Sequence, residues 1–496
     1  MLKKRLGHST LLMSLAASAN SVISFVIFIV LSRILSPAEI GLVAFALIFV
    51  EAGKIIVNAG FPHAIVQHPV WDDQRASTCF YLNLLFALSI ALFVFFIGAP
   101  LAARYYEAEA GPLLQVLSLI FFVDGIKAVH DGKLKREFAF RVIAIRSICG
   151  ALAGGITGIY LAINGYGVWA LVWQQLVNHS VVTVLTIMSS KWRPRLSFSP
   201  NHGRHLLAFS SPLMVAQLTG NISSKIFDIL IGIVIGPTAL GFFRIGGRVL
   251  YILQDVVLKP FEQTALSALA RIEQRLQQAL ATLRLLRMSS YLTFPIFFGA
   301  AAIGPEFIIF AFGEKWSTSG NLMTILAIGS APLGIGYQVN AALTASGHSR
   351  QVMMISSINL AVNILLAAAS VPFGLVAAAT GFALRSYFAI TASLFFFNRV
   401  FTIGWLRALQ SVAPSFTASL AMFLIVIAAK YFLADQLAPL LRLLLLALLG
   451  AVAYAVLMLT LFRKETSNFL TEGKDLVPPN MKPVVAGLQR LTRLDQ

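Results

Sequence analysis

Runs of about 20 apolar residues recur from one end of this sequence to the other, separated by short polar breaks. A run of that length is long enough for a helix to cross the hydrocarbon core of a bilayer. Because hydrophobic residues make up 58% of the 496 residues and charged residues only 12%, a water-soluble fold would lack the polar side chains to cover its core. The pattern therefore predicts an all-α integral membrane protein with about fourteen transmembrane helices. The predicted spans are 10–34, 38–60, 78–98, 112–130, 142–163, 168–188, 208–235, 238–258, 285–303, 320–345, 351–371, 374–396, 411–433 and 440–462.

Basic residues are divided unequally between alternate connecting segments. If the N-terminus is placed inside, the inner segments hold 27 Lys and Arg residues and the outer segments hold five. Short cytoplasmic loops are rich in Lys and Arg, so both termini are predicted to be cytoplasmic, including a tail at 463–496. This asymmetry and attraction to anionic lipid headgroups account for the net charge of +18 without a nucleic-acid partner.

Two pairs of turns indicate an internal repeat. Segment 36–41 (SPAEIG) matches 236–241 (GPTALG) at an offset of 200 residues, and 165–170 (GYGVWA) resembles 372–377 (PFGLVA). A repeat of six spans is parallel, because six is an even number, and rocking of two such halves is a route to alternating access. The predicted divisions are 1–205 and 206–396 as two six-helix bundles, 397–462 as two additional transmembrane helices, and 463–496 as the tail.

The segment between spans eight and nine is amphipathic. Leucines and isoleucines at helical spacing run from Leu266 to Leu283, within a stretch bounded by Lys259 and Arg287. We expect this segment to form a helix on the inner membrane surface that joins the two halves; a partner-binding helix is the alternative.

Ten ionisable residues fall within predicted spans, where each costs about 2.5–3.5 kcal/mol at a helix centre. Six are cations and four are acids, so complete pairing would leave a positive surplus. They are Glu51 and Lys54 in span 2, Asp124 and Lys127 in span 4, Lys225 and Asp228 in span 7, Arg244, Arg248 and Asp255 in span 8, and Arg385 in span 12.

Two interpretations of these charges remain open. One is that the neighbours in spans 2, 4 and 7 form intrahelical pairs that only hide each other's charge. Such pairing does not account for Arg244 and Arg248, whose acidic neighbour on the same stripe is Asp255, or for Arg385. The other interpretation is therefore a water-filled cavity that binds an anion, because guanidinium groups grip phosphate oxygens through two hydrogen bonds.

Motifs for catalysis, cofactors and metals are not found in the sequence. It has no P-loop, no G-x-S-x-G and no glycine-rich dinucleotide turn, and we predict neither an enzyme nor a cofactor. Its two cysteines, Cys79 and Cys149, have no metal-ligand spacing, and the eight histidines form no H-x-x-x-H pair, so we assign them no chemistry.

The sequence resembles the bacterial polysaccharide transport flippases, the Wzx-type family of the multidrug/oligosaccharidyl-lipid/polysaccharide exporter superfamily. The residues that carry the resemblance are Lys3-Lys4-Arg5 before a long first span, the turn at 33–41 (RILSPAEIG) and the segment 165–170. Segments 193–198 (RPRLSF) and 242–248 (FFRIGGR) are similar to the branch that exports exopolysaccharide or colanic-acid-like repeat units.

The resemblance implies a flippase of the bacterial inner membrane that moves an undecaprenyl-diphosphate-linked oligosaccharide from the cytoplasmic to the periplasmic leaflet. It also implies coupling to an ion gradient or to the membrane potential, and it allows contact with a polysaccharide polymerase and export machinery. The predicted diphosphate-binding residues are Lys54, Lys225, Arg244, Arg248 and Arg385, and those for ion coupling are Glu51, Asp228 and Asp255. The alternatives are a cation-coupled drug exporter of the same superfamily and a membrane polymerase or ligase of the same pathway.

Overall fold

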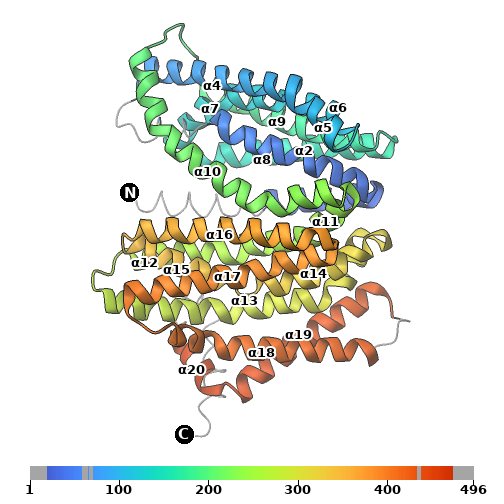
Figure 1. Cartoon of the computed structure of the whole chain (residues 1–496), viewed down its shortest axis with the longest axis vertical. Helices are drawn as coiled ribbons and strands as arrows, with labels where there is room; N and C mark the ends of the chain where they lie inside the picture. The colour runs from blue at the N-terminus through green and yellow to red at the C-terminus, as the bar shows by residue number, and fades with distance from the viewer. Residues whose placement is uncertain (1–18, 59–64, 66–70, 433–436, 473–496) are drawn as a thin grey trace. The chain divides into compact units, whose positions relative to one another are not determined.

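The computed structural model describes residues 19–58, 65, 71–432 and 437–472. These residues form helices and short connections, with no strand among them, which confirms the predicted all-α fold (Figure 1). Lys3-Lys4-Arg5 and most of the predicted tail lie outside the described residues.

The helices account for the fourteen predicted spans. Eleven described helical segments are at least 18 residues long and apolar enough to cross a membrane. The helix Ala19–Ile34, the long α10 (Pro200–Val234) and α11 (Pro237–Leu253) supply the remaining three. The chain is therefore a multi-pass membrane protein.

Contacts divide the chain into two compact units, Met1–Arg244 and Ile245–Gln496. The first unit includes α10, which packs against α2 and α4. The division by contacts falls inside α11, later than the predicted boundary at 205/206, and the predicted grouping of spans stays a prediction. The other helices of the first unit are α2 (Pro37–Asn58), α4 (Asp73–Phe93), η1 (Val94–Gly98), α5 (Ala99–Tyr105), α6 (Ala110–Leu117), α7 (Leu119–Arg136), α8 (Phe140–Ile163) and α9 (Val168–Ser190).

Side-chain caps fix where two of these helices begin. The backbone N–H of Ser36 donates to Glu39 Oε2 at 2.7 Å, and the backbone N–H of Glu39 donates to Ser36 Oγ at 3.3 Å. This reciprocal pair is a capping box, which satisfies N–H groups that the first turn of α2 leaves without a helical partner. Ser199 caps α10 in a similar way by accepting from the backbone N–H of His202.

The matched turns of the predicted repeat have matched structures. α2 begins at Pro37 and α11 begins at Pro237, and the two helices cross within the first unit at Gly41 and Gly241. A Cβ atom on Gly41 would lie 1.7 Å from the carbonyl oxygen of Pro237, and one on Gly241 would lie 2.0 Å from that of Pro37. The repeat-related backbones thus touch reciprocally at a point that admits only glycine.

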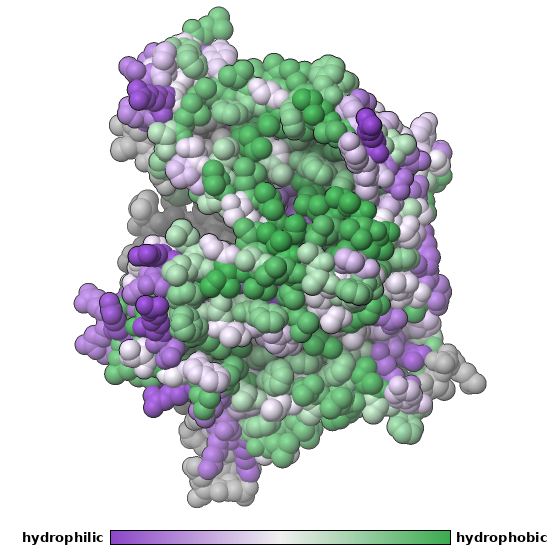
Figure 2. Space-filling model, in the orientation of Figure 1, coloured by the Kyte–Doolittle hydropathy of each residue, from purple (hydrophilic) through white to green (hydrophobic). Residues whose placement is uncertain are grey.

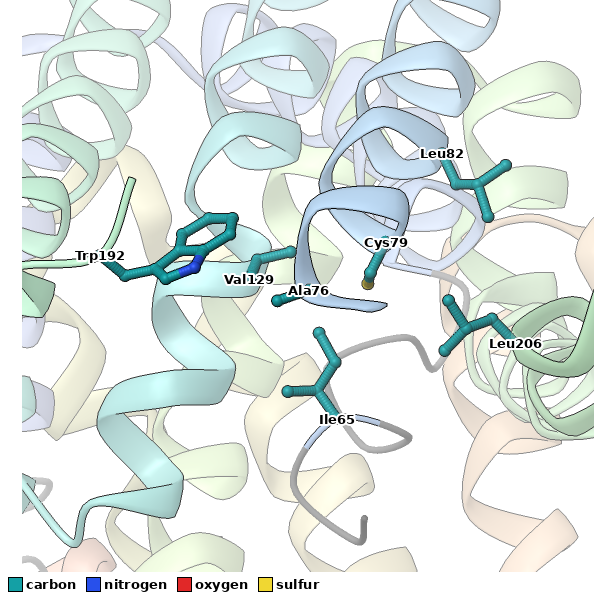
Figure 3. Packing of buried hydrophobic residues seen from close by; sticks show 7 residues of the cluster. All are labelled: Ile65, Ala76, Cys79, Leu82, Val129, Trp192 and Leu206. Carbon is teal, nitrogen blue, oxygen red and sulfur yellow. The ribbon is translucent and has the colours of Figure 1, made fainter. Parts of the chain in front are cut away.

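A buried cluster joins helix ends of the first unit (Figure 3). It brings together the start of α4, the end of α7 and the start of α10, with Trp192 from the connection after α9. Thr78 Oγ1 and Ser77 Oγ on α4 accept hydrogen bonds from the backbone of that connection. These contacts place several predicted cytoplasmic connections at one end of the unit. The cluster consists of Ile65, Ala76, Cys79, Leu82, Val129, Trp192 and Leu206.

The second unit contains the remaining helices. They are η2 (Gln254–Leu258), α12 (Lys259–Leu269), α13 (Arg275–Phe312), η3 (Glu314–Trp316), α14 (Ser317–Ser330), α15 (Leu333–Ala345), α16 (Ser349–Ser370), η4 (Val371–Phe373), α17 (Leu375–Phe401), α18 (Trp405–Phe432), α19 (Pro439–Thr460) and α20 (Arg463–Glu472). Within each unit, hydrophobic residues cover the middle of the helices and hydrophilic residues gather near their ends (Figure 2). This distribution fits helices that cross a bilayer.

The prediction of one surface helix over 259–287 is wrong. The first part of that segment, α12, continues from α11 through the π-helical turn η2, and the second part is the beginning of α13. A turn separates them, because helix α12 ends at Leu269 and α13 begins at Arg275. The apolar positions between Leu266 and Leu283 therefore belong to two helices, and α12 packs against α15 and α13.

Candidate functional site

The charged residues of the first unit meet across helices. Lys225 on α10 reaches Glu51 on α2, with Nζ and Oε2 3.0 Å apart. The Lys225 side chain is mostly buried, whereas that of Glu51 is 46% exposed. This pair links the last third of α10 to the second half of α2.

A second pair links α10 to α11. Arg244 places a guanidinium nitrogen 3.0 Å from Asp228 Oδ2, and the Asp228 side chain is only 4% exposed. Asp228 lies one turn beyond Lys225 on α10, so the two pairs are neighbours along that helix. The acid that compensates Arg244 is thus on another helix, whereas the acidic neighbour on its own helical stripe, Asp255, pairs with Lys259.

A third group lies around Asp124 of α7, whose side chain is 1% exposed. Lys127 contacts one carboxylate oxygen at 2.5 Å and Lys54 of α2 contacts the other at 3.4 Å. His179 of α9 adds a hydrogen bond of 2.9 Å from Nδ1 to Oδ1. The single buried carboxylate of Asp124 therefore contacts three basic side chains, which come from three helices.

Together these groups form a ladder of alternating charge, which we call the charge ladder. Neighbours on one helix are three residues apart, and each helix exchanges an ion pair with the next. Intrahelical pairing alone, the first interpretation of these charges, is therefore wrong for Glu51–Lys54 and Lys225–Asp228 and incomplete for Asp124–Lys127. Four cations face three acids even when His179 is neutral, so the ladder has a positive surplus. In order, its members are Arg244, Asp228, Lys225, Glu51, Lys54, Asp124 and Lys127.

The remaining predicted site residues, Arg248, Asp255 and Arg385, belong to the second unit. Arg248 follows Arg244 by one turn on α11. Arg385 of α17 lies over the ring of Phe382, with Cζ 3.5 Å from the ring centroid. Asp255 pairs with Lys259 at 2.7 Å, and both side chains are more than half exposed.

An ion cluster among the described residues of the second unit links α13 to α18 and α19. Glu306 of α13 contacts Lys430 of α18 at 2.7 Å and Arg442 of α19 at 3.9 Å. The three side chains are largely buried. This cluster fastens the additional helices α18 and α19 to α13.

Comparison with known protein families shows a match for this chain. Residues 30–321, more than half of the sequence, match a family described as "Polysaccharide biosynthesis protein". The chain belongs to this family. The matched region contains the whole charge ladder, because it runs from the first span to α14.

Several proteins of polysaccharide biosynthesis are similar to this chain in sequence. The succinoglycan biosynthesis transport protein ExoT of Rhizobium meliloti is 27% identical over 307 residues, which cover 62% of each chain. The teichuronic acid biosynthesis protein TuaB of Bacillus subtilis is 23% identical over 64% of this chain and 66% of its own length. The lipopolysaccharide biosynthesis protein WzxC of Escherichia coli is 21% identical over 64% of this chain and 65% of its own. The chain thus matches slightly less than two thirds of the length of each of these relatives.

Solved structures show which fold this family member has. The inward closed conformation of the lipid II flippase MurJ superposes with a TM-score of 0.76 at 13% identity, covering 92% of this chain and 99% of that one. An inward-facing multidrug resistance MATE transporter superposes with a TM-score of 0.57 at 14% identity, covering 80% and 96%. At such identities the likeness shows a shared fold and no shared substrate.

Sequence reasoning missed His179. We assigned the histidines no chemistry because they form no metal-binding pair, yet His179 contacts both Lys54 and Asp124. The available signal was that His179 is the only histidine in the middle of a predicted span. An ionisable side chain at that depth needs a partner, and this one has two.

Proposed function

We propose that this family member is a flippase for a lipid-linked oligosaccharide of the undecaprenyl diphosphate type. It moves the oligosaccharide from the cytoplasmic to the periplasmic leaflet of the bacterial inner membrane by alternating access, for the synthesis of exopolysaccharide or lipopolysaccharide. Both termini lie in the cytoplasm, as the distribution of basic residues predicts.

The charge ladder is the observation that carries this proposal. Placing a charged side chain within a membrane span costs free energy, and a surplus of cations there costs more unless an anion binds at the site. Lys54, Lys225 and Arg244 of the ladder bind the diphosphate in this proposal. Arg248 and Arg385 of the second unit remain predicted diphosphate-binding residues. The guanidinium groups supply two parallel hydrogen bonds to phosphate oxygens, and the ammonium groups supply point charges.

The acids of the site have a second role in the proposal. Glu51 and Asp228 hold Lys225 and Arg244 in the absence of substrate. When a diphosphate binds, each of these two cations exchanges its carboxylate partner for a phosphate group. An ion that binds to a vacated carboxylate is a means of coupling transport to a gradient, and Glu51, Asp228 and Asp255 are the candidates for this.

The names of similar proteins support this substrate class. ExoT is named as a transport protein of succinoglycan biosynthesis, and MurJ is named as a lipid II flippase. The MATE structures share the fold, so a drug exporter is the alternative within the superfamily, but the cationic surplus favours an anionic substrate. A polymerase or ligase is the alternative outside it. Membrane lipids, a polysaccharide polymerase and export machinery are the expected partners.

Substitution of Arg248 tests the proposal in cells that depend on this chain for polymer export. We expect Arg248→Ala to abolish export while the protein still accumulates in the membrane, because the diphosphate loses a bidentate partner. Arg195→Ala is the matched control, since the Arg195 side chain is 71% exposed and pairs with Asp73 outside the spans. Normal export by the Arg248 variant would refute its assignment to the site.

A further inference from the structure

His179 lies between a cation and an anion. Its Nδ1 is 2.9 Å from Asp124 Oδ1, and its Nε2 is 3.4 Å from Lys54 Nζ. Lys54 Nζ is in turn 3.4 Å from the other oxygen of Asp124. The three groups form a closed triangle in which every side is a polar contact.

The chemistry of the partners fixes the hydrogens on the imidazole ring. A carboxylate only accepts hydrogen bonds, so Nδ1 carries the proton that it donates to Asp124. An ammonium group only donates, so Nε2 accepts from Lys54 and carries no proton. The triangle is therefore satisfied only while His179 is neutral.

A second proton on His179 changes these contacts. It would sit on Nε2 and point at the ammonium group of Lys54, so a hydrogen bond would become a repulsion between two like charges. The imidazolium would also compensate Asp124 directly. Lys54 then loses its hydrogen bond to His179 and most of its attraction to Asp124. It is displaced towards Glu51, its neighbour one turn away on α2.

The other elements packed against α9 do not change this balance. From α7 the facing groups are Asp124 and Lys127, which remain paired in both states. Helix α8 has two charged side chains, Arg141 and Arg146, and Arg141 is exposed. Arg146 is held by Asp131 of α7 and by Thr186, which lies two turns beyond His179 on α9. Helix α6 carries no titratable side chain.

We propose that His179 is a proton-operated switch that determines whether Lys54 is held at Asp124 or released to the anionic substrate. The inference rests on the proposed function, because it needs a diphosphate to receive Lys54. Proton binding and diphosphate binding then favour each other, and linkage requires the effect to be reciprocal. Binding of substrate is accordingly accompanied by uptake of a proton.

The test is a binding titration of the full chain in detergent with farnesyl diphosphoryl glucose. Both phosphates of this probe are esterified, so the probe does not titrate where histidine does. Affinity should rise by about tenfold between about pH 8 and about pH 5.5 for the unaltered protein. His179→Asn keeps a donor for Asp124 but cannot be protonated, and it should bind with the same affinity at both pH values. His205→Asn, at an exposed histidine of α10, should behave as the unaltered protein does.

A second measurement needs no variant. Calorimetric titrations in two buffers of different ionisation enthalpy report the protons taken up on binding, and we expect net uptake near neutral pH. Binding without proton uptake, or pH dependence that persists in His179→Asn, would overturn the switch and leave the flippase proposal standing. If the unaltered protein does not bind the probe at either pH, the flippase proposal fails and the switch fails with it.

Discussion

Replacement of Gly41 by alanine would create the shortest steric clash at any described glycine of the chain. Gly41 on α2 crosses Gly241 on α11, and the added Cβ would lie 1.7 Å from the carbonyl oxygen of Pro237 and 2.8 Å from the backbone nitrogen of Gly241. Both neighbours are backbone atoms, so no flexible side chain can move aside. The two helices must separate instead.

The size of the effect follows from these distances. Ordinary contacts of a Cβ atom begin at 3.4 Å, so the crossing must open by up to 1.7 Å. Overpacking of a well-packed interior costs about 1–3 kcal/mol, and a clash of backbone with backbone belongs at the upper end of that range. For a unit of this size we expect the melting temperature to fall by roughly 6–12 °C.

Thermal unfolding of the purified chain in detergent measures this change. Gly220→Ala is the matched control, because Gly220 lies inside helix α10 with nothing within 4 Å of its added Cβ. There alanine should stabilise the helix by about 0.5–1 kcal/mol. A Gly41→Ala variant that melts at the temperature of the unaltered protein or above it would show that the two backbones do not cross at this distance.

Two further predictions concern ion pairs. Lys225→Glu should lower stability by about 1 kcal/mol, since it sets a second carboxylate against Glu51. The exchange Glu51→Lys with Lys225→Glu should restore only part of this loss in thermal unfolding, because it places the new carboxylate one turn from Asp228 and the new ammonium group one turn from Lys54; a double variant no more stable than the single one would mean that the pair is not the interaction lost. Glu306→Gln should loosen α18 and α19, because Lys430 and Arg442 lose a buried carboxylate, at a cost of about 3 kcal/mol. Amide exchange should quicken in α18 and α19 and stay unchanged in α8 and α9; equal exchange in α18 would contradict the role given to Glu306.

The membrane fold could be predicted from the sequence because its signals are local. Apolar length and the asymmetry of basic residues need no knowledge of which helices touch, and they yielded the fourteen spans. The repeat was also visible, since Pro37 and Pro237 mark equivalent helix starts. That these turns would touch each other was not visible, because contacts between distant segments leave no trace in local periodicity.

The charge ladder was only half predictable. Spacing along one helix grouped Lys225 with Asp228 and Glu51 with Lys54, but each charge pairs with another helix. A sequence shows which residues share a helical face and leaves open which helix that face meets. The same limit hid His179, whose partners are 55 and 125 residues away.

The surface helix was predicted wrongly for a related reason. Amphipathic spacing between Leu266 and Leu283 continues across the break after Leu269, so periodicity alone reads two helices as one. The turn between them lacks the glycine or proline that usually announces such a break.

The central claim is that cations within the membrane meet a lipid-linked diphosphate. Its most direct test reconstitutes the purified chain in vesicles and follows the leaflet position of a fluorescent oligosaccharide carried on a prenyl diphosphate, with a fluorescent organic cation as the competing cargo. We expect the unaltered chain to move the diphosphate lipid between leaflets and the Arg248→Ala variant to leave it in place. Movement of the organic cation with no movement of the diphosphate lipid would contradict it.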